Sequence, residues 1–230
     1  MNSRYSRQIA IPEIGKEGQS RIQNAKVFVI GCGALGSMVA MQLAGAGIGC
    51  IGIADFDTVD ISNLQRQFFF GNEDAGKSKA EVLAFRIKEL NPETKVVSFE
   101  EMMIRNKALE IFKDYDFIVD GTDNPESKRM TGNVCQILKK ACTIGGVREF
   151  SGQVMTFLSE DPRLEEFFGS GVGEGFLPCS LSGVLGPAAV FCASVLASET
   201  LKYITGAGNL LSGKIFVFDL KTNSFRVIEL

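Results

Sequence analysis

A strand–turn–helix–strand pattern near the N-terminus constrains the fold most. Lys26–Ile30 is an apolar run of strand length, and the glycines of Gly31-x-Gly33-x-x-Gly36 follow at once. A helix is predicted over about residues 34–46, and a second apolar strand over Cys50–Ala54. Two strands joined by a helix lie parallel in one sheet, with a right-handed connection. The pattern therefore indicates a βαβ unit with a glycine-rich turn after its first strand.

Strands and helices continue to alternate along the chain. Further helices are expected at residues 77–90, 106–112, 125–140 and 184–205, and further strands at 96–99, 117–120, 143–145, 153–158, 214–220 and 225–230. This predicts an α/β fold: a Rossmann-like, doubly wound, mainly parallel sheet, extended by C-terminal antiparallel strands. We expect a single domain. Residues 1–25 would form an N-terminal arm, residues 26–150 the nucleotide-binding part, and residues 151–230 a crossover loop, a long helix and a hairpin.

The composition narrows the classes of function. A net charge of −3 and a pI near 5.2 argue against nucleic acid as a main partner. The chain has no apolar run of bilayer-spanning length and no signal-peptide core at its start, so we expect no membrane partner and a cytoplasmic location. Histidine is absent from the sequence, which excludes a Ser-His-Asp triad and every histidine-bearing zinc site. Any general base must be a carboxylate, a lysine or the substrate itself.

The glycine-rich turn predicts a nucleotide site. Gly31, Gly33 and Gly36 would let backbone N–H groups approach phosphate at a helix N-terminus, where the helix dipole favours anions. Asp55 lies 19 residues beyond Gly36 (55 − 36), at the end of the next strand, where a carboxylate can bind ribose hydroxyls. NAD-binding and ATP-binding proteins share these features, so they do not identify the nucleotide.

The segment after Asp55 favours a triphosphate. Arg66 supplies planar, charge-assisted donors for phosphate, and Asn63 adds a neutral donor. Lys79, near the start of a predicted helix, can add a point charge. Asp123 follows the fourth strand and could hold Mg²⁺ through an oxygen. Each residue alone has an ordinary alternative, because the two cations could be solvated surface charges and Asp123 a helix cap.

A series of motifs in order along the chain resembles one enzyme family. The motifs are Arg4-Tyr5-Ser6-Arg7-Gln8, GCGALG at 31–36, DFDTVDISNLQRQ at 55–67, GKSKAE at 76–81, GTDN at 121–124, GVLGP at 183–187 and GKIFVFD at 213–219. They are similar to those of the bacterial ThiF/MoeB/HesA adenylating enzymes, the simpler relatives of the ubiquitin-activating enzymes. The SNLQRQ string at this distance from the glycine turn is highly specific.

The resemblance implies a reaction, its cofactors and its partners. The substrate would be the C-terminal glycine carboxylate of a ubiquitin-like sulfur carrier with a diglycine tail (ThiS- or MoaD-like). This carboxylate would attack the α-phosphate of ATP and displace pyrophosphate, in sulfur transfer for cofactor biosynthesis. ATP and Mg²⁺ would be bound by Arg7, Gly31, Gly33, Gly36, Asp55, Asp57, Asn63, Arg66, Lys79 and Asp123. Arg66, Lys79 and Asp123 would be catalytic, with Asp123 as the magnesium ligand. A homodimer is implied, in which Arg7 reaches the phosphates of the partner subunit.

Cysteine usage departs from the family pattern. Many members hold a structural zinc with two C-x-x-C pairs. This chain has no such pair, so we expect no zinc site and a loop at 159–178 that is ordered another way or left mobile. No rhodanese-like segment follows, which implies a separate sulfur donor. Cys179 matches a family cysteine that in some members links covalently to the carrier, so it is either a sulfur-transfer residue or a spare thiol. Cys32 is interpreted as a filler of the turn, and most of the others as reduced core thiols.

Other functions remain open from the sequence. An NAD-dependent oxidoreductase could use the same turn, but none of Tyr5, Tyr115 and Tyr203 stands in a Tyr-x-x-x-Lys setting. A non-catalytic scaffold that binds a carrier is a second alternative, and adenylation of a peptide or a tRNA base is a third. The pathway that a carrier would serve, whether thiamin, molybdopterin, cysteine or another, also stays open.

Overall fold

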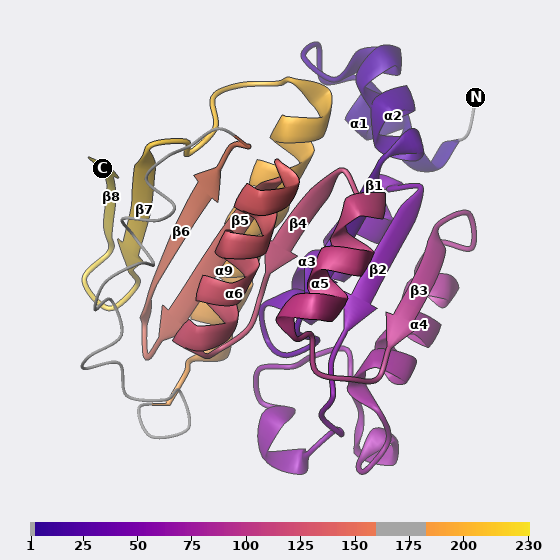
Figure 1. Ribbon diagram of the computed structural model, residues 1–230, viewed down its shortest axis with the longest axis vertical. Helices are drawn as coiled ribbons and strands as arrows, with labels where there is room; N and C mark the ends of the chain where they lie inside the picture. Colours follow the sequence, from indigo (N-terminus) through magenta and orange to yellow (C-terminus); the bar gives the residue numbers. More distant parts are fainter. Residues whose placement is uncertain (1–2, 160–182) are drawn as a thin grey trace.

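The strands form one continuous sheet (Figure 1). The computed structural model describes residues 3–159 and 183–230. Within these residues eight strands follow the order β3-β2-β1-β4-β5-β6-β7-β8. They span β1 (Lys26–Ile30), β2 (Cys50–Ala54), β3 (Lys95–Phe99), β4 (Phe117–Asp120), β5 (Ala141–Arg148), β6 (Ser151–Phe157), β7 (Lys214–Asp219) and β8 (Ser224–Glu229). The pairs from β3 to β5 are parallel, and those from β5 to β8 are antiparallel. The predicted Rossmann-like sheet with an antiparallel extension is confirmed.

Helices cover both faces of this sheet (Figure 1). One face carries α3 (Gly36–Ala46), α4 (Lys79–Leu90) and α9 (Gly186–Thr205). The other face carries α5 (Arg105–Ile111) and α6 (Pro125–Leu138). Short 3-10 turns lie in the connections: η2 (Ile61–Asn63), η3 (Asn72–Asp74) and η4 (Phe112–Asp114). Among the described helices, none combines the length and apolarity needed to cross a bilayer.

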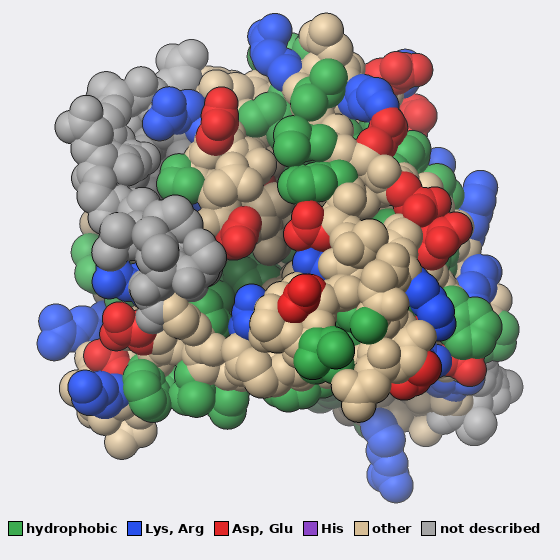
Figure 2. All heavy atoms as spheres, turned by 90° about the horizontal axis from the view of Figure 1, so that it is seen from below, with side chains coloured by type: hydrophobic (Ala, Val, Ile, Leu, Met, Phe, Trp, Pro, Cys, Tyr) green, Lys and Arg blue, Asp and Glu red, His purple; other side chains and the backbone are tan. Residues whose placement is uncertain are grey.

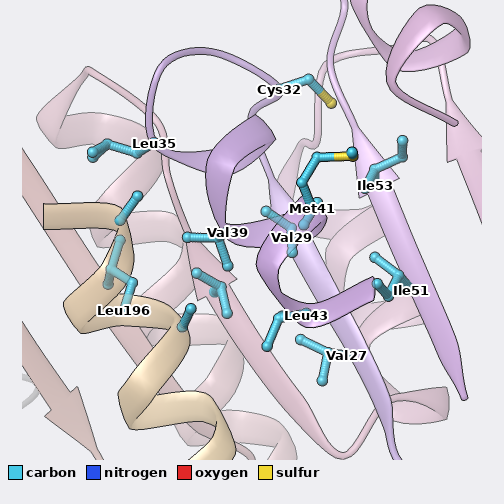
Figure 3. Close-up of a cluster of buried hydrophobic side chains, with 14 of the residues drawn as sticks. Val27, Val29, Cys32, Leu35, Val39, Met41, Leu43, Ile51, Ile53 and Leu196 are labelled. Carbon is cyan, nitrogen blue, oxygen red and sulfur yellow. The ribbon is translucent and has the colours of Figure 1, made fainter. Parts of the chain in front are cut away.

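The sheet divides the buried core into two clusters. The larger lies between the sheet and α3, α4 and α9, and includes Val29, Val39 and Leu196 (Figure 3). The smaller lies under α5 and α6 around Phe28 and Phe112, whose ring centroids are 5.3 Å apart. Phe28 and Val29 are neighbours on β1, and their side chains belong to the clusters on opposite faces of the sheet. Because both faces of β1 are buried, its sequence is a continuous apolar run.

Caps at two helix starts order the loops at the carboxyl ends of the parallel strands. The Ser78 hydroxyl caps α4 by accepting a hydrogen bond from the N–H of Glu81. The Asn124 side chain caps α6 by accepting from the N–H of Ser127, and proline occupies the first turn of that helix. Both caps therefore fix the start of the helix that follows each loop.

The N-terminal segment, expected only as an arm, is helical and packed. It contains η1 (Ser3–Tyr5), α1 (Ser6–Ile9) and α2 (Gly15–Asn24), which lie near the amino ends of the parallel strands (Figure 1). Tyr5 is 3% exposed; its hydroxyl accepts a hydrogen bond from Asn91 Nδ2 and donates one to Glu93. Asn91 Nδ2 also donates to the carbonyl of Ala44, near the end of α3. This network attaches the N-terminal segment to the ends of α3 and α4.

Some boundaries differ from those expected. A strand was predicted at 143–145, whereas β5 runs over Ala141–Arg148. Gly145 and Gly146 interrupt the apolar pattern, yet a side chain at Gly145 would lie 2.7 Å from Leu196 Cδ1. The strand therefore continues because α9 packs directly on its backbone and because β4 and β6 pair with it on either side. The loop expected at 159–178 lies outside the described residues, apart from Ser159.

Candidate functional site

The topology places a crevice between β1 and β4. These strands are neighbours, but β1 leads into α3 on one face of the sheet and β4 into α6 on the other. Open α/β sheets bind their ligands at such a switch point, beyond the carboxyl ends of the strands. Figure 2 shows the molecule from this end; its surface is hollowed near the middle, with acidic and basic side chains around the hollow.

Three glycines allow the backbone to pack closely under this crevice. Gly31 directly follows β1 and has a φ of +83°, a left-handed conformation that glycine adopts without strain. A side chain on Gly36 would overlap the carbonyl oxygen of Gly31, and one on Gly121 would lie 2.8 Å from the nitrogen of Gly36. The turn after β1 and the loop after β4 are therefore in direct backbone contact.

Gly33 and the start of α3 form the exposed side of the turn. The nearest atom to a side chain built on Gly33 would be Gln67 Nε2, at 3.6 Å, so the space above this glycine is otherwise open. α3 begins after Leu35, whose apolar side chain cannot accept hydrogen bonds from the first helical N–H groups. The positive end of the helix is thus available to an anion.

Asp55 connects the end of β2 to the turn. Its carboxylate accepts hydrogen bonds from the N–H groups of Cys32 at 2.6 Å and Asp57 at 2.8 Å. Burial raises the pKa of Asp55, and these two hydrogen bonds oppose the rise. Burial also raises the pKa of the fully buried Cys32 thiol well above its usual value. Cys32 is therefore a protonated filler, whereas each Asp55 oxygen keeps a lone pair for a ligand hydroxyl.

Lys79 forms a partly buried ion pair with Asp57. The residue is 5% exposed, and its Nζ lies 3.0 Å from Asp57 Oδ2. Its backbone N–H donates to the carbonyl of the same aspartate, also at 3.0 Å. The lysine is therefore no freely solvated surface charge. Asp57 holds it at the first residue of α4.

The segment with Asn63 and Arg66 is folded against α9. The backbone N–H of Arg66 donates to the Asn63 carbonyl at 3.0 Å, and Arg66 Nη1 donates to the Ser62 carbonyl at 3.2 Å. A side chain on Gly186, the first residue of α9, would lie 2.9 Å from the carbonyl oxygen of Gln65. Both predicted phosphate-binding side chains, of Asn63 and Arg66, remain partly exposed.

Gln67 is a site residue to which the sequence assigned no role. It is 5% exposed, and among the described residues its Oε1 has no hydrogen-bond partner. Its Nε2 lies beside Gly33. A buried amide oxygen without a partner costs free energy, so a ligand or a water on the turn would be its natural donor. The SNLQRQ string contains Gln67, but nothing in the string indicates that this amide faces the glycines.

A buried ion pair lies under the loop that contains Asp123. Asp120 is fully buried, and Lys128 Nζ lies 3.3 Å from its Oδ1. From the sequence, Asp120 is expected only as the last residue of a buried strand, and Lys128 has no predicted role. Asp123 itself is exposed, one residue before Asn124, the cap of α6.

A comparison of the sequence with known protein families agrees with the geometry of this site. The sequence model of the ThiF family matches residues 5–230. The chain belongs to the ThiF family. The resemblance inferred from the motifs is therefore confirmed.

Relatives of this ThiF-family chain include proteins named as adenylyltransferases. A probable adenylyltransferase/sulfurtransferase MoeZ of Mycobacterium tuberculosis is 38% identical over 234 residues, which are 99% of this chain and 60% of the relative. A sulfur carrier protein adenylyltransferase of Thermus thermophilus is 35% identical over 230 residues, which are 97% of this chain and 85% of the relative. The chain thus spans about three fifths of the MoeZ relative.

Solved structures show the same fold. The crystal structure of PaaA superposes with a TM-score of 0.82 at 24% identity, covering 98% of this chain and 72% of that one. Escherichia coli MccB with ATP gives a TM-score of 0.83 at 22% identity, covering 100% and 72%.

Most of the predicted nucleotide contacts of this ThiF-family chain follow the ends of β1, β2 and β4. They are Gly31, Gly33, Gly36, Asp55, Asp57, Asn63, Arg66, Lys79 and Asp123. Arg7 does not join them: it lies in α1, beyond the far end of α3, a helix about 16 Å long. Cys179 lies outside the described residues. The roles of all these residues as ligands stay predictions.

Proposed function

We propose that this chain uses Mg-ATP to adenylate the C-terminal glycine carboxylate of a ubiquitin-like sulfur-carrier protein and releases pyrophosphate. The observation that carries the proposal is the open space above Gly33 at the uncapped start of α3. It is a ready anion site, and Asp55, Arg66 and Lys79 follow on neighbouring segments. The names of the two relatives described above, both adenylyltransferases, support this reaction over hydride transfer.

The residues of the chain would act by positioning and by electrostatics. The carrier carboxylate is ionised at neutral pH, so it can attack the α-phosphate without a general base. The bond to pyrophosphate breaks as the new acyl–phosphate bond forms, and the negative charge leaves with pyrophosphate. Arg66 and Lys79 would offset charge on the phosphates, and the Asp55 carboxylate would accept from ribose hydroxyls. A chain without histidine can perform all these steps.

Asp123 would hold Mg²⁺. The donor set fits this ion, because magnesium in nucleotide sites is usually bound by one or two carboxylates together with the substrate phosphates. When bound, the ion would neutralise phosphate charge during transfer. Among the described residues no group of three or more His, Cys, Asp or Glu side chains could hold a metal ion alone. Asp123 would therefore share the ion with oxygens of the bound phosphates and of water.

A homodimer would bring Arg7 to the phosphates of the second subunit. Arg7 is exposed at the end of the molecule opposite the crevice, so it cannot reach the site of its own subunit without unfolding α1. Co-expressed Arg7→Ala and Lys79→Met chains test this arrangement. Half of the dimers would be mixed, each with one intact site, so activity should recover to about a quarter of wild type. If each subunit used its own Arg7, the mixture would stay inactive.

Sulfur transfer would follow adenylation and would draw on a sulfur donor. Cys179 is the candidate for a covalent link to the carrier. In a reconstituted assay with a donor, Cys179→Ser should abolish formation of the carrier thiocarboxylate while leaving adenylation intact. Full thiocarboxylate formation by this variant would remove the covalent role.

ATP–pyrophosphate exchange tests the proposed reaction directly. Diglycine-tailed carrier proteins are added one at a time with Mg²⁺, and Arg66→Ala is compared with Lys113→Ala, which removes an exposed cation in η4. Exchange should depend on one carrier, vanish in Arg66→Ala and persist in Lys113→Ala. ATP binding without exchange for any carrier would indicate a peptide, a tRNA base or a binding role instead. Tighter binding of NAD than of Mg-ATP would refute the nucleotide assignment.

A further inference from the structure

A contribution to stability does not explain why a buried ion pair, Asp120–Lys128, lies beneath the crevice. Asp120 is fully buried at the end of β4, and the Lys128 side chain is 16% exposed. A buried ion pair is weakly stabilising at best, because desolvation of both charges offsets their attraction, and well-packed apolar residues often serve as well. The groups that the pair orders therefore indicate its role.

Lys128 joins three structural elements. Its ammonium donates to the carbonyl oxygens of Thr122 and Gly145, at 2.6 Å each, and to Asp120 Oδ1 at 3.3 Å. An ammonium has three N–H donors, so these acceptors use all of them. Lys128 thus ties α6 to the end of β4 and to the middle of β5. It is left with no donor for a substrate.

The pair holds every polar group of Thr122. The backbone N–H and the hydroxyl of Thr122 both donate to Asp120 Oδ1, at 2.9 and 2.6 Å, and its carbonyl accepts from Lys128. The other Asp120 oxygen accepts from the hydroxyl of Thr131 at 2.6 Å. Thr122 is therefore fixed from both sides by one ion pair.

Asp123 stands between two fixed residues. Thr122 before it is held by the ion pair, and Asn124 after it caps α6 through a 2.7 Å hydrogen bond from the N–H of Ser127. Asp123 is exposed on this rigid backbone, at the edge of the crevice. A short carboxylate that must bind a metal ion together with bound phosphates depends on such fixed geometry.

We propose that Asp120 and Lys128 are positioning residues, which fix Thr122 so that the Asp123 carboxylate is held ready for the magnesium ion of bound Mg-ATP. This inference rests on the proposed function. The buried ion pair thereby controls how strongly Mg²⁺ raises the affinity for the nucleotide. Neither residue touches the nucleotide.

Calorimetric titration of ATP with and without Mg²⁺ tests the inference without any turnover. The measured quantity is the magnesium gain, the factor by which Mg²⁺ raises the affinity for ATP. Lys128→Met should reduce this gain by about tenfold, because the loop loses its anchor. Thr131→Val is the matched control: it removes a buried hydrogen bond to the same Asp120 but leaves the contacts of Thr122 intact, so its gain should equal that of wild type.

A double variant separates positioning from a merely structural role. If Lys128 acts through Asp123, adding Lys128→Met to Asp123→Asn should reduce the magnesium gain no further. Hydrogen exchange of the Thr122 amide, which donates to Asp120, should accelerate in Lys128→Met and not in Thr131→Val. If Lys128→Met does not fold, Lys128→Gln replaces it; this side chain keeps two N–H donors, and its gain should fall between wild type and Asp123→Asn.

Several results would overturn the inference. They are a wild-type magnesium gain in the folded Lys128 variant, an equal loss in Thr131→Val, or losses in Lys128→Met and Asp123→Asn that multiply. If the wild-type chain binds Mg-ATP but shows no exchange with any carrier, the proposed reaction fails while the titrations still decide the role of Lys128. If it binds no ATP at all, both proposals fail.

Discussion

Three glycines in and beside α3 allow the predicted role of the glycine-rich turn to be tested by adding single methyl groups. In Gly36→Ala, the new Cβ would overlap the carbonyl oxygen of Gly31 and lie 2.9 Å from its carbonyl carbon. It would also approach Val29 Cγ1 at 3.3 Å. Both nearest atoms belong to backbone, so the turn itself must open. We expect a loss of about 3 kcal/mol or more in the free energy of unfolding, the upper range for overpacking a close contact.

Gly33→Ala should separate binding from folding. The new methyl group would meet only Gln67 Nε2, at an ordinary contact distance of 3.6 Å, so stability should change by less than about 0.5 kcal/mol. The same methyl group would fill the space through which phosphate approaches the N–H groups of the turn. We expect the affinity for Mg-ATP to fall by about ten- to a hundredfold, equivalent to about 1.4–2.8 kcal/mol.

Gly45→Ala is the control within the same helix. Gly45 is exposed in the last turn of α3, and the nearest neighbour of a side chain built on it would be Leu90 Cδ2 at 3.9 Å. Alanine there should stabilise the protein by about 0.5–1 kcal/mol and leave nucleotide binding unchanged. Urea unfolding followed by circular dichroism measures stability, and isothermal titration measures Mg-ATP affinity. If Gly33→Ala bound Mg-ATP like wild type, the phosphates would not lie on this turn.

Three other variants test two buried carboxylates and the predicted phosphate-binding lysine. Hydrogen bonding by the Gly71 N–H, the largest cause, lowers the pKa of Asp74. Asp74→Asn should therefore lower the free energy of unfolding by about 1–2 kcal/mol at pH 7. This loss should shrink as the pH falls below about 3.9, the pKa of the unfolded state, toward the lower pKa of the folded state. An equal loss at pH 7 and pH 3, measured by urea unfolding, would contradict this. Glu199→Ala should cost about 3 kcal/mol in thermal unfolding, because a buried hydroxyl and a backbone N–H lose their acceptor, without changing Mg-ATP affinity. Lys79→Met should keep stability within about 1 kcal/mol but lower Mg-ATP affinity at least about tenfold; unchanged affinity in a titration would make the lysine purely structural.

The sequence predicted best those strands whose two faces are both buried. β1, β2 and β4 begin and end at the predicted residues, because a continuous apolar run bounded by polar or glycine residues leaves little choice. β5 was predicted too short, since its glycines have no side chain to signal burial. The N-terminal helices were missed for a different reason. α1 and α2 are mostly polar, and Ile22 is their one apolar residue that is fully buried, so their helicity depends on packing against α9 and the end of α3.

The sequence predicted site residues where a motif fixes their spacing, and missed those that depend on orientation. Asp120 and Asp123 are three residues apart at the end of one strand, and only the fold shows that the first points into the protein toward Lys128 while the second is exposed. The partner of Lys79, 22 residues away in the chain, could not be inferred from spacing either. Pairings of this kind depend on tertiary geometry.

The natural thiols of this protein can report how it opens. Within the described part of the chain all five cysteines are free; Cys32 and Cys192 belong to the larger core cluster, and Cys135 and Cys142 to the smaller one on the opposite face of the sheet. Burial raises the pKa of Cys192 to about 12, so alkylation must wait until the thiol is exposed. Peptide-resolved labelling rates therefore show, without engineered probes, whether the two sides of the sheet open together or one at a time, and whether bound nucleotide slows the opening at Cys32 alone.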